Sequence, residues 1–338
     1  TVGVTVMVDS FRASVSNWLS ASLRADIYVS APALHTGQPG VALAPAVLGR
    51  LRHIAGVDAL STGRRISIEA GGHRVALFAL GLEHTLQPRY PLKAGDPEYV
   101  WPAFLAGEGV LVSEPLAWHQ RLGIGEHISI HTDSGNRDFR VLGIYYDYGS
   151  QSGEVLMHRP LYERHFADRS VSGAGLYLAA DTDLRQTIES VRQATAGIQN
   201  LNVVSNRELR EISLAIFDRT FTITGVLRLL VIVVAFIGIL SAFMALQLER
   251  SRELGVLRAT GFTPAQVAGM VTAQTGFMGL VAGLLAIPTG LALAALLIEV
   301  INRRAFGWSM TTVIPADALL EAVLLATAAA LLAGIYPG

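Results

Sequence analysis

The histidines are the residues of this sequence whose type and spacing first suggest chemistry. All nine lie between residues 35 and 165, and imidazole serves both as a metal ligand and as a general base near neutral pH. His127 and His131 would share one face of a strand, but Ile128 and Ile130 alternate with them, as in a half-buried strand with a polar outer face. The sequence has no His-Glu-x-x-His, Gly-x-Ser-x-Gly or Walker-type motif. We therefore predict no metal site, no cofactor and no catalytic residue.

A second polar group, formed by Tyr145, Tyr146, Asp147 and Tyr148, ends a predicted strand. Its hydroxyl and carboxyl groups would be able to contact a ligand. The alternative is a strand end whose hydroxyl groups are hydrogen-bonded to neighbouring residues, which is the more frequent situation of a tyrosine in a folded domain. The sequence leaves both interpretations open.

A compact charged segment, residues 249–261, interrupts the most apolar half of the chain. It reads Glu-Arg-Ser-Arg-Glu-Leu-Gly-Val-Leu-Arg-Ala-Thr-Gly, and the stretches on either side, 229–248 and 264–298, contain no charged residue. A helix of about 20 residues spans the roughly 30 Å of a bilayer core. Because short arginine-rich loops tend to stay in the cytoplasm, we expect residues 249–261 to lie on that side, between two membrane spans.

This segment is either a topology anchor alone or a docking element for a soluble partner. Docking is favoured by a helical pattern that places Leu254, Leu257 and Val256 on one side and the charges on the other. It is also favoured by a helix stop and restart. Gly261 fits the left-handed position after a helix, and Thr263-Pro264 fit the N-cap and first residue of the next one.

Composition restricts the class of protein. Of 338 residues, 51% are hydrophobic and 16% are charged, and the apolar excess lies after about residue 220. The formal net charge of −1 gives no electrostatic footprint for nucleic acid, which we do not expect as a partner. The chain has no cysteine, which excludes disulfides and thiol chemistry. These features predict a multi-pass membrane protein with one large polar domain.

That polar domain, residues 26–204, has the mixed pattern of an α+β fold. Strand–helix–strand pieces at 27–60 and 176–204 are expected to form a small α/β sheet, with a β-rich insertion at about 64–157. Residues 80–105 carry no signal that places them. We therefore predict an α+β domain joined to an α-helical transmembrane module of about three spans.

The charged segment resembles the coupling segment of the FtsX-like/MacB-like family of ABC transporter permeases. The family pattern is roughly Glu-Arg-x-x-Glu-x-(Gly/Ala)-x-Leu-(Arg/Lys)-Ala-x-Gly. The matching positions are Glu249, Arg250, Glu253, Gly255, Leu257, Arg258, Ala259 and Gly261. The resemblance implies that this helix docks into a groove of a separate ATP-binding cassette ATPase subunit, and that this chain is not itself an enzyme.

The polar domain is similar to the extracytoplasmic domain of the same family in three stretches. Residues 110–117 are similar to its strand-Ser-Glu motif, 122–126 to Leu-Gly-x-x-Gly-(Asp/Glu), and 139–144 to Phe-x-Val-x-Gly-Ile. The resemblance implies a multi-pass protein of the bacterial inner (plasma) membrane with a large periplasmic domain. It further implies a second permease chain or module, and membrane lipid, as partners.

The residues and the resemblance together give an expected order of segments. It comprises the end of a truncated transmembrane helix (1–8), an amphipathic stalk helix (9–25), the extracytoplasmic domain (26–204), a stalk and transmembrane helix (205–248), the cytoplasmic coupling segment (249–263), a transmembrane helix (264–301), an extracytoplasmic connector (302–316) and a truncated last transmembrane helix (317–338).

The function predicted from the resemblance is that of a permease subunit. It would transmit ATPase-driven motion across the membrane to the extracytoplasmic domain, for export, lipoprotein or lipid handling, or mechanotransmission. One alternative is a membrane-tethered sensor or receptor with an extracytoplasmic ligand-binding domain. Another is a membrane-anchored hydrolase that uses the histidine-rich domain. A receptor would tolerate substitution of Arg250 or Glu253, whereas a mechanically coupled permease would not.

Overall fold

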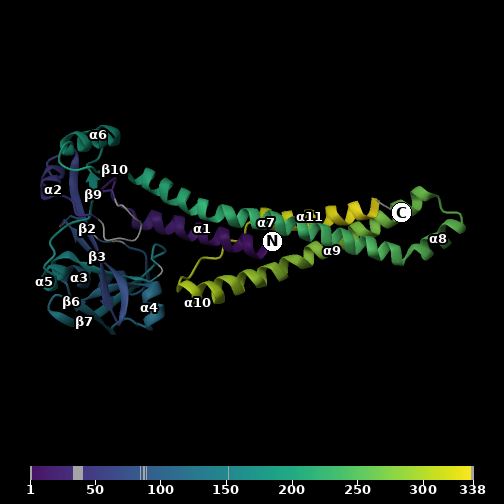
Figure 1. Cartoon of the computed structure of the whole chain (residues 1–338), viewed down its shortest axis with the longest axis horizontal. Coiled ribbons are helices and arrows are strands. Elements are labelled where there is room, and N and C mark those ends of the chain that lie inside the picture. Colours follow the sequence, from purple (N-terminus) through teal and green to yellow (C-terminus); the bar gives the residue numbers. More distant parts are fainter. Residues whose placement is uncertain are drawn as a thin grey trace. The chain divides into compact units, whose positions relative to one another are not determined.

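The computed structural model describes residues 2–32, 41–83, 85–86, 88, 90–150 and 152–335. It divides into two compact units, whose elements are labelled in Figure 1. The first, called the α/β unit, comprises residues 15–215 and 305–308, and the second, called the helical unit, comprises residues 1–14, 216–304 and 309–338.

The α/β unit is built on one mixed sheet. In the described part of the chain, ten strands form it in the order β10-β1-β9-β2-β3-β8-β5-β7-β4, and β6 pairs with β7 and with the end of β2. Most neighbours are antiparallel, whereas β3–β8 and β5–β7 are parallel. The strands are β1 (Ile27–Ser30), β2 (Val57–Ala70), β3 (His73–Leu82), β4 (Leu92–Ala94), β5 (Val110–Ser113), β6 (His127–Thr132), β7 (Gly135–Tyr145), β8 (Glu154–His158), β9 (Gly173–Leu178) and β10 (Asn202–Ser205).

Strand β2 joins the two halves of this sheet. The sequence separates the piece that ends at residue 60 from the β-rich insertion that begins at about residue 64, but the structure has one strand of 14 residues across this boundary. Gly63, inside this strand, explains the difference. A Cβ at Gly63 would lie 2.6 Å from the ring of Phe78 on β3, so the glycine makes room for an aromatic ring across the ladder and does not start a turn.

The predicted pairing of the flanking pieces is confirmed. β1 lies between β9 and β10, antiparallel to both, and β9 is antiparallel to β2. The β-rich middle, expected as an insertion, continues the same sheet through β2 and β3. The α/β unit therefore has one sheet rather than two.

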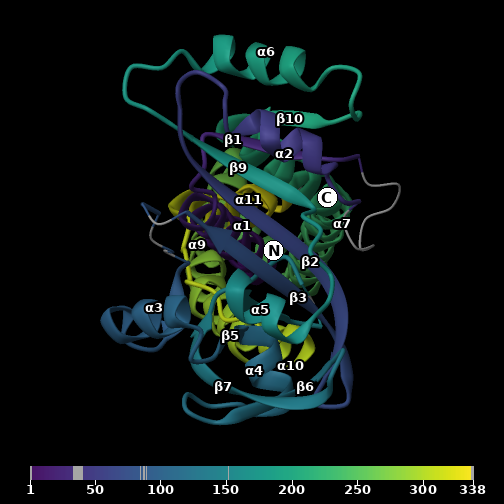
Figure 2. The same ribbon diagram turned by 90° about the vertical axis from the view of Figure 1, so that its left-hand side faces the viewer.

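Helices of the α/β unit cover separate regions of the sheet. They are α2 (Pro45–Leu51), α3 (Pro97–Ala106), α4 (Glu114–Gln120), α5 (Arg159–His165) and α6 (Leu184–Thr195). α2 and α6 pack together beside β10 (Figure 2) and enclose a buried cluster that includes Val47 and Val191. α4 and α5 contribute Leu116 and Tyr162 to another buried cluster under β3, β5 and β8.

Residues 80–105, which the sequence leaves unplaced, contain β4 and most of α3. The carboxylate of Asp96 caps α3 by accepting a hydrogen bond from the backbone N–H of Glu98 at 3.0 Å, and Pro97 is the first helical residue. Phe104 of α3 is fully buried against the sheet. This segment is therefore an integral part of the fold.

Two long helices, α1 (Val2–Ser22) and α7 (Asn206–Glu249), have residues in both units. The remaining helices are α8 (Ser251–Ala259), α9 (Pro264–Ala295), the π-helical η1 (Leu296–Asn302), α10 (Arg303–Phe306) and α11 (Ala316–Ile335). α1 is continuous across residues 8 and 9, where the sequence predicts the end of one helix and the start of another. Likewise η1 and α10 continue the helix to Phe306, beyond its expected end at residue 301.

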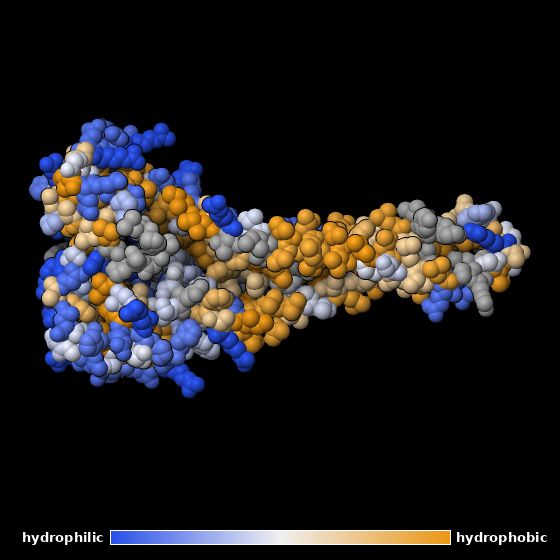
Figure 3. All heavy atoms as spheres, in the orientation of Figure 1, coloured by the Kyte–Doolittle hydropathy of each residue, from blue (hydrophilic) through white to orange (hydrophobic). Residues whose placement is uncertain are grey.

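Three helical stretches of the described chain are long and apolar enough to cross a membrane. They are Gly225–Leu246, Pro264–Phe306 and Ala316–Gly334. Figure 3 shows hydrophobic side chains gathered along these helices, whereas the visible face of the α/β unit is largely hydrophilic. We treat the three stretches as membrane spans below, on the basis of their length and composition.

Small residues bring α9 and α11 together. The backbone at Gly279 and Gly283 of α9 lies against Ala330 and Val323 of α11. Glycines at these two positions let the two helix backbones approach closely. Gly269 differs, because in the described structure a Cβ added there would have no neighbour within 4 Å.

Candidate functional site

The coupling segment folds as a short helix between two long ones. α7 ends at Glu249, Arg250 has a non-helical backbone, and α8 begins at Ser251. The eight positions that match the family pattern thus fall in three places. Glu249 and Arg250 form the junction, Glu253, Gly255, Leu257, Arg258 and Ala259 lie in α8, and Gly261 lies in the turn that follows.

The turn after α8 has the hydrogen bonds of a Schellman motif. The N–H of Phe262 donates to the carbonyl of Leu257 at 3.3 Å, and the N–H of Gly261 donates to the carbonyl of Arg258 at 3.2 Å. Gly261 has φ +102°, a conformation that glycine adopts without the strain that a Cβ would cause. The predicted helix stop at Gly261 is confirmed.

The restart of the chain as α9 is equally well defined. Thr263 is the N-cap and Pro264 the first helical residue, as predicted. Thr263 Oγ1 accepts a hydrogen bond from the N–H of Gln266 at 3.3 Å, and Gln266 Oε1 accepts one from the N–H of Thr263 at 3.0 Å. The Thr-x-x-Gln pattern of residues 263–266 is the sequence signature of this capping box. Together the two caps fix where α8 ends and α9 begins.

Most described side chains of the coupling segment are exposed, as judged against the described part of the chain. Val256 is 63% exposed and Phe262 is 46% exposed, although both are large and apolar. Within the described residues, no ion pair and no side-chain hydrogen bond holds Glu253 or Arg258. Leu257 is half-buried, and the side chain of Leu254 lies outside the described residues. The segment therefore exposes both apolar and charged groups.

The histidine-rich strand has the alternation that the sequence predicts. His127 and His131 of β6 are exposed, whereas Ile128 and Ile130 are buried. His131 Nδ1 lies 2.8 Å from Oδ1 of Asn136 on β7. Among the described residues, no group of three or more His, Cys, Asp or Glu side chains is arranged to hold a metal ion.

The tyrosine–aspartate run at the end of β7 belongs to a buried polar cluster. The Tyr145 hydroxyl donates to Glu154 Oε2 on β8 at 3.1 Å. Glu154 Oε1 also pairs with Arg65 Nε on β2 at 2.8 Å. Of the two interpretations of this run, Tyr145 fits the one in which the hydroxyl is bonded to a neighbour.

Asp147 is the electrostatically unusual member of this cluster. It is 6% exposed, and its Oδ1 accepts a hydrogen bond from the N–H of Gly149 at 2.8 Å. Its Oδ2 is buried with no hydrogen-bond partner among the described atoms. Burial, reinforced by the negative charge of Glu154, raises the pKa of Asp147 to about 7. The loop after β7 therefore contains a carboxyl group that changes charge near neutral pH.

Three aromatic rings meet beside this loop. The ring of Tyr148 lies 6.0 Å from that of Trp18 on α1 and 5.9 Å from that of Trp308. Gly307 packs directly on α4, where an added Cβ would lie 2.9 Å from Cα of Pro115. The connector residues 305–308 thus belong to the α/β unit, a placement for which the sequence carries no signal.

Within the helical unit, α1 is tied to its neighbours by polar contacts. Ser10 Oγ accepts a hydrogen bond from the N–H of Val313 at 2.9 Å, and Ser14 Oγ accepts one from the N–H of Thr311 at 3.1 Å. Arg12 Nε pairs with Asp218 of α7 at 2.8 Å. The connector before α11 and the helix α7 are both fastened to α1.

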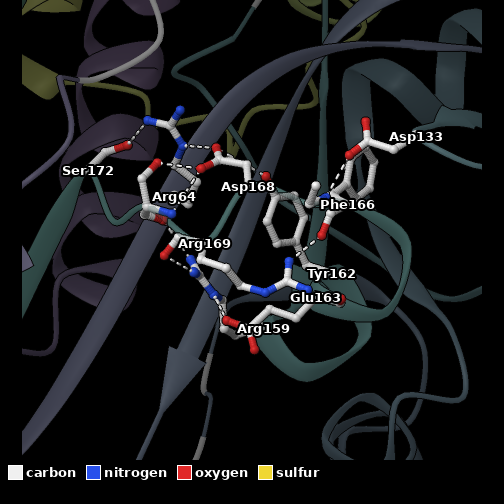
Figure 4. Close-up of polar contacts among 11 residues, drawn as sticks. Arg64, Asp133, Arg159, Tyr162, Glu163, Phe166, Asp168, Arg169 and Ser172 are labelled. Atoms are coloured by element: carbon white, nitrogen blue, oxygen red, sulfur yellow. Dashed lines mark hydrogen bonds and ion pairs between the residues drawn. The ribbon is translucent and has the colours of Figure 1, made fainter.

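A polar network holds the loop after α5 (Figure 4). Asp168 Oδ2 accepts a hydrogen bond from Arg64 Nε of β2 at 2.7 Å, and its Oδ1 accepts one from Ser170 Oγ at 2.6 Å. Arg159 Nη1 donates to the carbonyl of Ser170 at 2.9 Å. These bonds fix residues 166–172 between α5 and β9, which stiffens this part of the α/β unit.

Several known proteins are similar to this chain. Residues 225–338 match the FtsX-like permease C-terminal family. The chain is 41% identical over 340 residues to an uncharacterised ABC transporter permease protein of Mycobacterium tuberculosis, covering 99% of this chain and 40% of that protein. It is 24% identical over 193 residues to an uncharacterised ABC transporter permease of Methanocaldococcus jannaschii, covering 55% of this chain and 46% of that protein. The chain spans less than half the length of either relative.

Solved structures similar to the chain include two extracytoplasmic domains. The extracellular domain of the ABC-type transporter YknZ from Gram-positive bacteria is 12% identical, with a TM-score of 0.38 over 54% of this chain and 100% of that domain. The periplasmic region of MacB from Actinobacillus actinomycetemcomitans is 11% identical, with a TM-score of 0.38 over 57% of this chain and 94% of that region. The resemblance drawn from the sequence is thus confirmed as a similarity: residues 225–338 match the model of the FtsX-like permease C-terminal family.

Proposed function

We propose that this chain is the permease part of an ABC transporter and that α8 receives motion from a separate ATP-binding cassette ATPase subunit. The observation that carries the proposal is the coupling segment, a capped helix with uncovered apolar and charged side chains between two membrane spans. A short helix joined directly to α7 at one end and by a well-defined turn to α9 at the other passes force applied to it on to both. ATP binding and hydrolysis are assigned to the partner.

The long helices supply a route to the α/β unit. α7 is one helix of 44 residues that contains both the first span and residues of the α/β unit, so it is a continuous covalent path along which motion of its α8 end is passed on. α1 is fastened to α7 through Arg12 and Asp218, and it carries Trp18 into the aromatic contact with Tyr148. The connector residues 305–308 supply another attachment to the α/β unit.

The resulting function is transmission of ATPase-driven motion to an extracytoplasmic domain, for export, lipoprotein or lipid handling, or mechanotransmission. The relatives' description as ABC transporter permeases supports it. We assign the protein to the bacterial inner (plasma) membrane, with residues 249–263 cytoplasmic and the α/β unit periplasmic. A second permease chain or module completes the assembly around a two-fold ATPase dimer.

The test is purification, in mild detergent and from its native membrane, of the full-length protein that contains this chain. Co-eluting proteins are identified and ATPase activity is measured for Glu253→Ala and Arg258→Ala. Glu189→Ala and Arg185→Ala, which remove exposed charges from α6, are the matched controls. We expect a stoichiometric ATPase that is lost in the α8 variants and kept in the controls. A permease without ATPase, unchanged by the α8 variants, would contradict the proposal and favour the sensor.

A further inference from the structure

Part of strand β2 has no neighbouring strand on one side in the described structure. On the side of β3, β2 is paired from Ser61 to Ala70. On its other side, β9 ends opposite Gly63 and β6 is paired only at Ala70. Residues 64–69, called the open edge below, therefore lie between two paired stretches. At about 3.3 Å per residue, the open edge is about 20 Å long.

The turn between β2 and β3 determines which backbone groups of the open edge point outward. Ala70 and His73 flank the two-residue turn Gly71-Gly72, whose φ angles are +57° and +78°, so they form a hydrogen-bonded pair. Hydrogen-bonded pairs recur at every second residue of an antiparallel ladder. The N–H and C=O groups of Arg65 and Ser67 therefore point away from β3.

An observed hydrogen bond on the other side of β3 agrees with this assignment. Ala76 lies opposite Ser67, and its N–H points away from β2 and donates to the carbonyl of Gly153 at 3.3 Å. Within the described residues, no hydrogen bond reaches the outward N–H and C=O groups of Arg65 and Ser67. These groups are thus available to a further strand.

A groove with a volume of about 580 Å³ adjoins the open edge. Residues 66–69 of β2 line one part of it, and residues 131–133 of β6 and its turn line another. Phe166, 7% exposed, adds an apolar ring to the lining. The turn is held in place because Asp133 Oδ2 accepts a hydrogen bond from the N–H of Ala167 at 2.6 Å (Figure 4). The open edge thus borders a defined space within the α/β unit.

The side chains of the open edge alternate in character. Ser67 and Glu69 are exposed, whereas Ile66 is half-buried and Ile68 is buried. Ile66 and Ile68 pack in the same apolar cluster as Phe166. Because opposite residues of neighbouring strands share a face of the sheet, a residue opposite Ser67 would face solvent and one opposite Ile66 would face this cluster. The open edge therefore fits a segment in which polar and apolar residues alternate.

We propose that the open edge binds a short extended segment of a separate protein by strand addition. The segment has alternating polar and apolar residues, and its backbone bonds to the outward N–H and C=O groups of Arg65 and Ser67. A flexible segment is required because β9 and β6 close both ends of the open edge. A second copy of this chain has its own open edge recessed in the same way, so two such edges do not meet. The proposal does not depend on the coupling of α8 to an ATPase.

The first test uses a fluorescein-labelled peptide, Thr-Val-Thr-Val-Thr-amide, whose binding to the chain in mild detergent is followed by fluorescence anisotropy. With the valines facing the apolar cluster, the threonines lie opposite Arg65 and Ser67 and turn their N–H groups toward β2. N-methylation of the central threonine should weaken binding about tenfold or more, whereas N-methylation of the valine before it should change binding by less than about threefold. Equal effects of the two methyl groups, or no binding at about 1 mM peptide, would overturn the proposal.

The second test changes the open edge itself. Ser67→Pro removes an outward N–H and no bond to β3, and a strand tolerates proline where its N–H is not bonded in the ladder. Ser67→Ala keeps the N–H and is the matched control. We expect the proline variant to lower the affinity for the peptide about tenfold or more and the alanine variant to leave it unchanged. Equal affinities of the two variants, each with the wild-type melting temperature, would overturn the proposal. The methylated peptides keep the test decisive if the proline variant does not fold.

Two measurements on the chain without peptide check the choice of occupant. In hydrogen exchange, the amides of Arg65 and Ser67 should exchange faster than those of Ile66 and Ile68. Equal protection would mean that a segment of this chain fills the groove, and would overturn the proposal. A wild-type dimer that Ser67→Pro converts to a monomer would assign the open edge to a second copy, and would overturn it as well.

Discussion

Gly279 of α9 lies so close to Ala330 of α11 that a Cβ on the glycine would be 2.4 Å from the Cβ of the alanine. The carbonyl oxygen of Ala326 would be 2.9 Å away from the same Cβ. Neither atom belongs to a flexible side-chain end, so a methyl group at Gly279 must push the two helices apart. At Gly276 the nearest atom is Cδ2 of Leu331, at 2.7 Å, and this side chain is able to rotate.

We therefore predict a graded response to alanine along one face of α9. Gly279→Ala should destabilise the helical unit by about 1–3 kcal/mol, because overpacking displaces backbone. Gly276→Ala should cost less, and Gly269→Ala should be neutral or stabilising, because its Cβ meets nothing and alanine favours the helix. Thermal unfolding in detergent, followed by circular dichroism at the helix band, measures the series. Equal effects at all three positions would contradict the close packing of α9 and α11.

The two glycines of the coupling segment should respond differently to alanine. Gly261 has φ +102°, so Gly261→Ala strains the turn and should lower both stability and coupled ATPase activity. Gly255 lies inside α8 with nothing within 4 Å of an added Cβ, so Gly255→Ala should strengthen the helix by up to about 1 kcal/mol.

Gly255→Ala is informative because its effects on stability and on coupling are separable. Loss of ATPase coupling without loss of stability would mean that a partner approaches the backbone at this position. Unimpaired coupling would mean that the glycine is not needed for docking. ATPase activity and the melting temperature, measured on the same preparation, distinguish the two results.

Asp147 should give the α/β unit a pH-dependent stability. Its pKa is raised to about 7, so the folded unit holds a proton that the unfolded chain has released, and stability should fall as pH rises from about 4 to 7. One proton corresponds to at most about 1.4 kcal/mol per pH unit. Asp147→Asn should remove this slope and stabilise the unit at pH 8, where wild-type Asp147 is charged.

Tryptophan fluorescence during thermal unfolding measures this prediction. All four tryptophans belong to the α/β unit, so the signal reports on that unit alone. Asp58→Asn, at an exposed aspartate, is the matched control and should leave the slope in place. A wild-type stability that is flat between pH 4 and 7 would contradict the assignment of Asp147.

The contribution of Asp168 to stability should depend on pH in the opposite direction to that of Asp147. Burial pulls its pKa upward, but hydrogen bonds from Ser170 and Arg64 outweigh burial and hold the pKa at about 2. Its contribution to stability is present above the ordinary aspartate pKa of about 4 and is lost as pH falls toward 2. At neutral pH, Asp168→Asn should cost about 1–2 kcal/mol, since its side chain is partly exposed. Asp138→Asn, on an exposed position of β7, should cost little under the same measurement.

The parts of the fold that the sequence predicts well are those set by local chemistry. The end of α8 and the start of α9 depend on Gly261 and Thr263-Pro264, which act on backbone groups within a few residues. The alternation of histidine and isoleucine in β6 is similarly local. The position of the coupling segment was therefore predictable from composition and capping residues, whereas its docking role stays a proposal.

The parts that the sequence misses depend on distant residues. β2 is one strand because Gly63 faces a ring on β3, a contact that no local pattern reveals. α3 has a readable start at Asp96-Pro97, but Pro102 inside it reads as a helix breaker. The π-helical turn η1 and the seating of Gly307 on α4 likewise have no signature among adjacent residues.

The undivided strand β2 has a consequence for how the α/β unit comes apart. Its first half is bonded to β9 beside one buried cluster, and its second half is bonded to β3 beside another. Opening either cluster means breaking ladder bonds of the same strand, so the two clusters should unfold as one foldon. Amide protons of β2 that are bonded in the ladders would then exchange together, at the rate of global opening. Under an applied force, the α/β unit should therefore unfold cooperatively, without one cluster opening before the other.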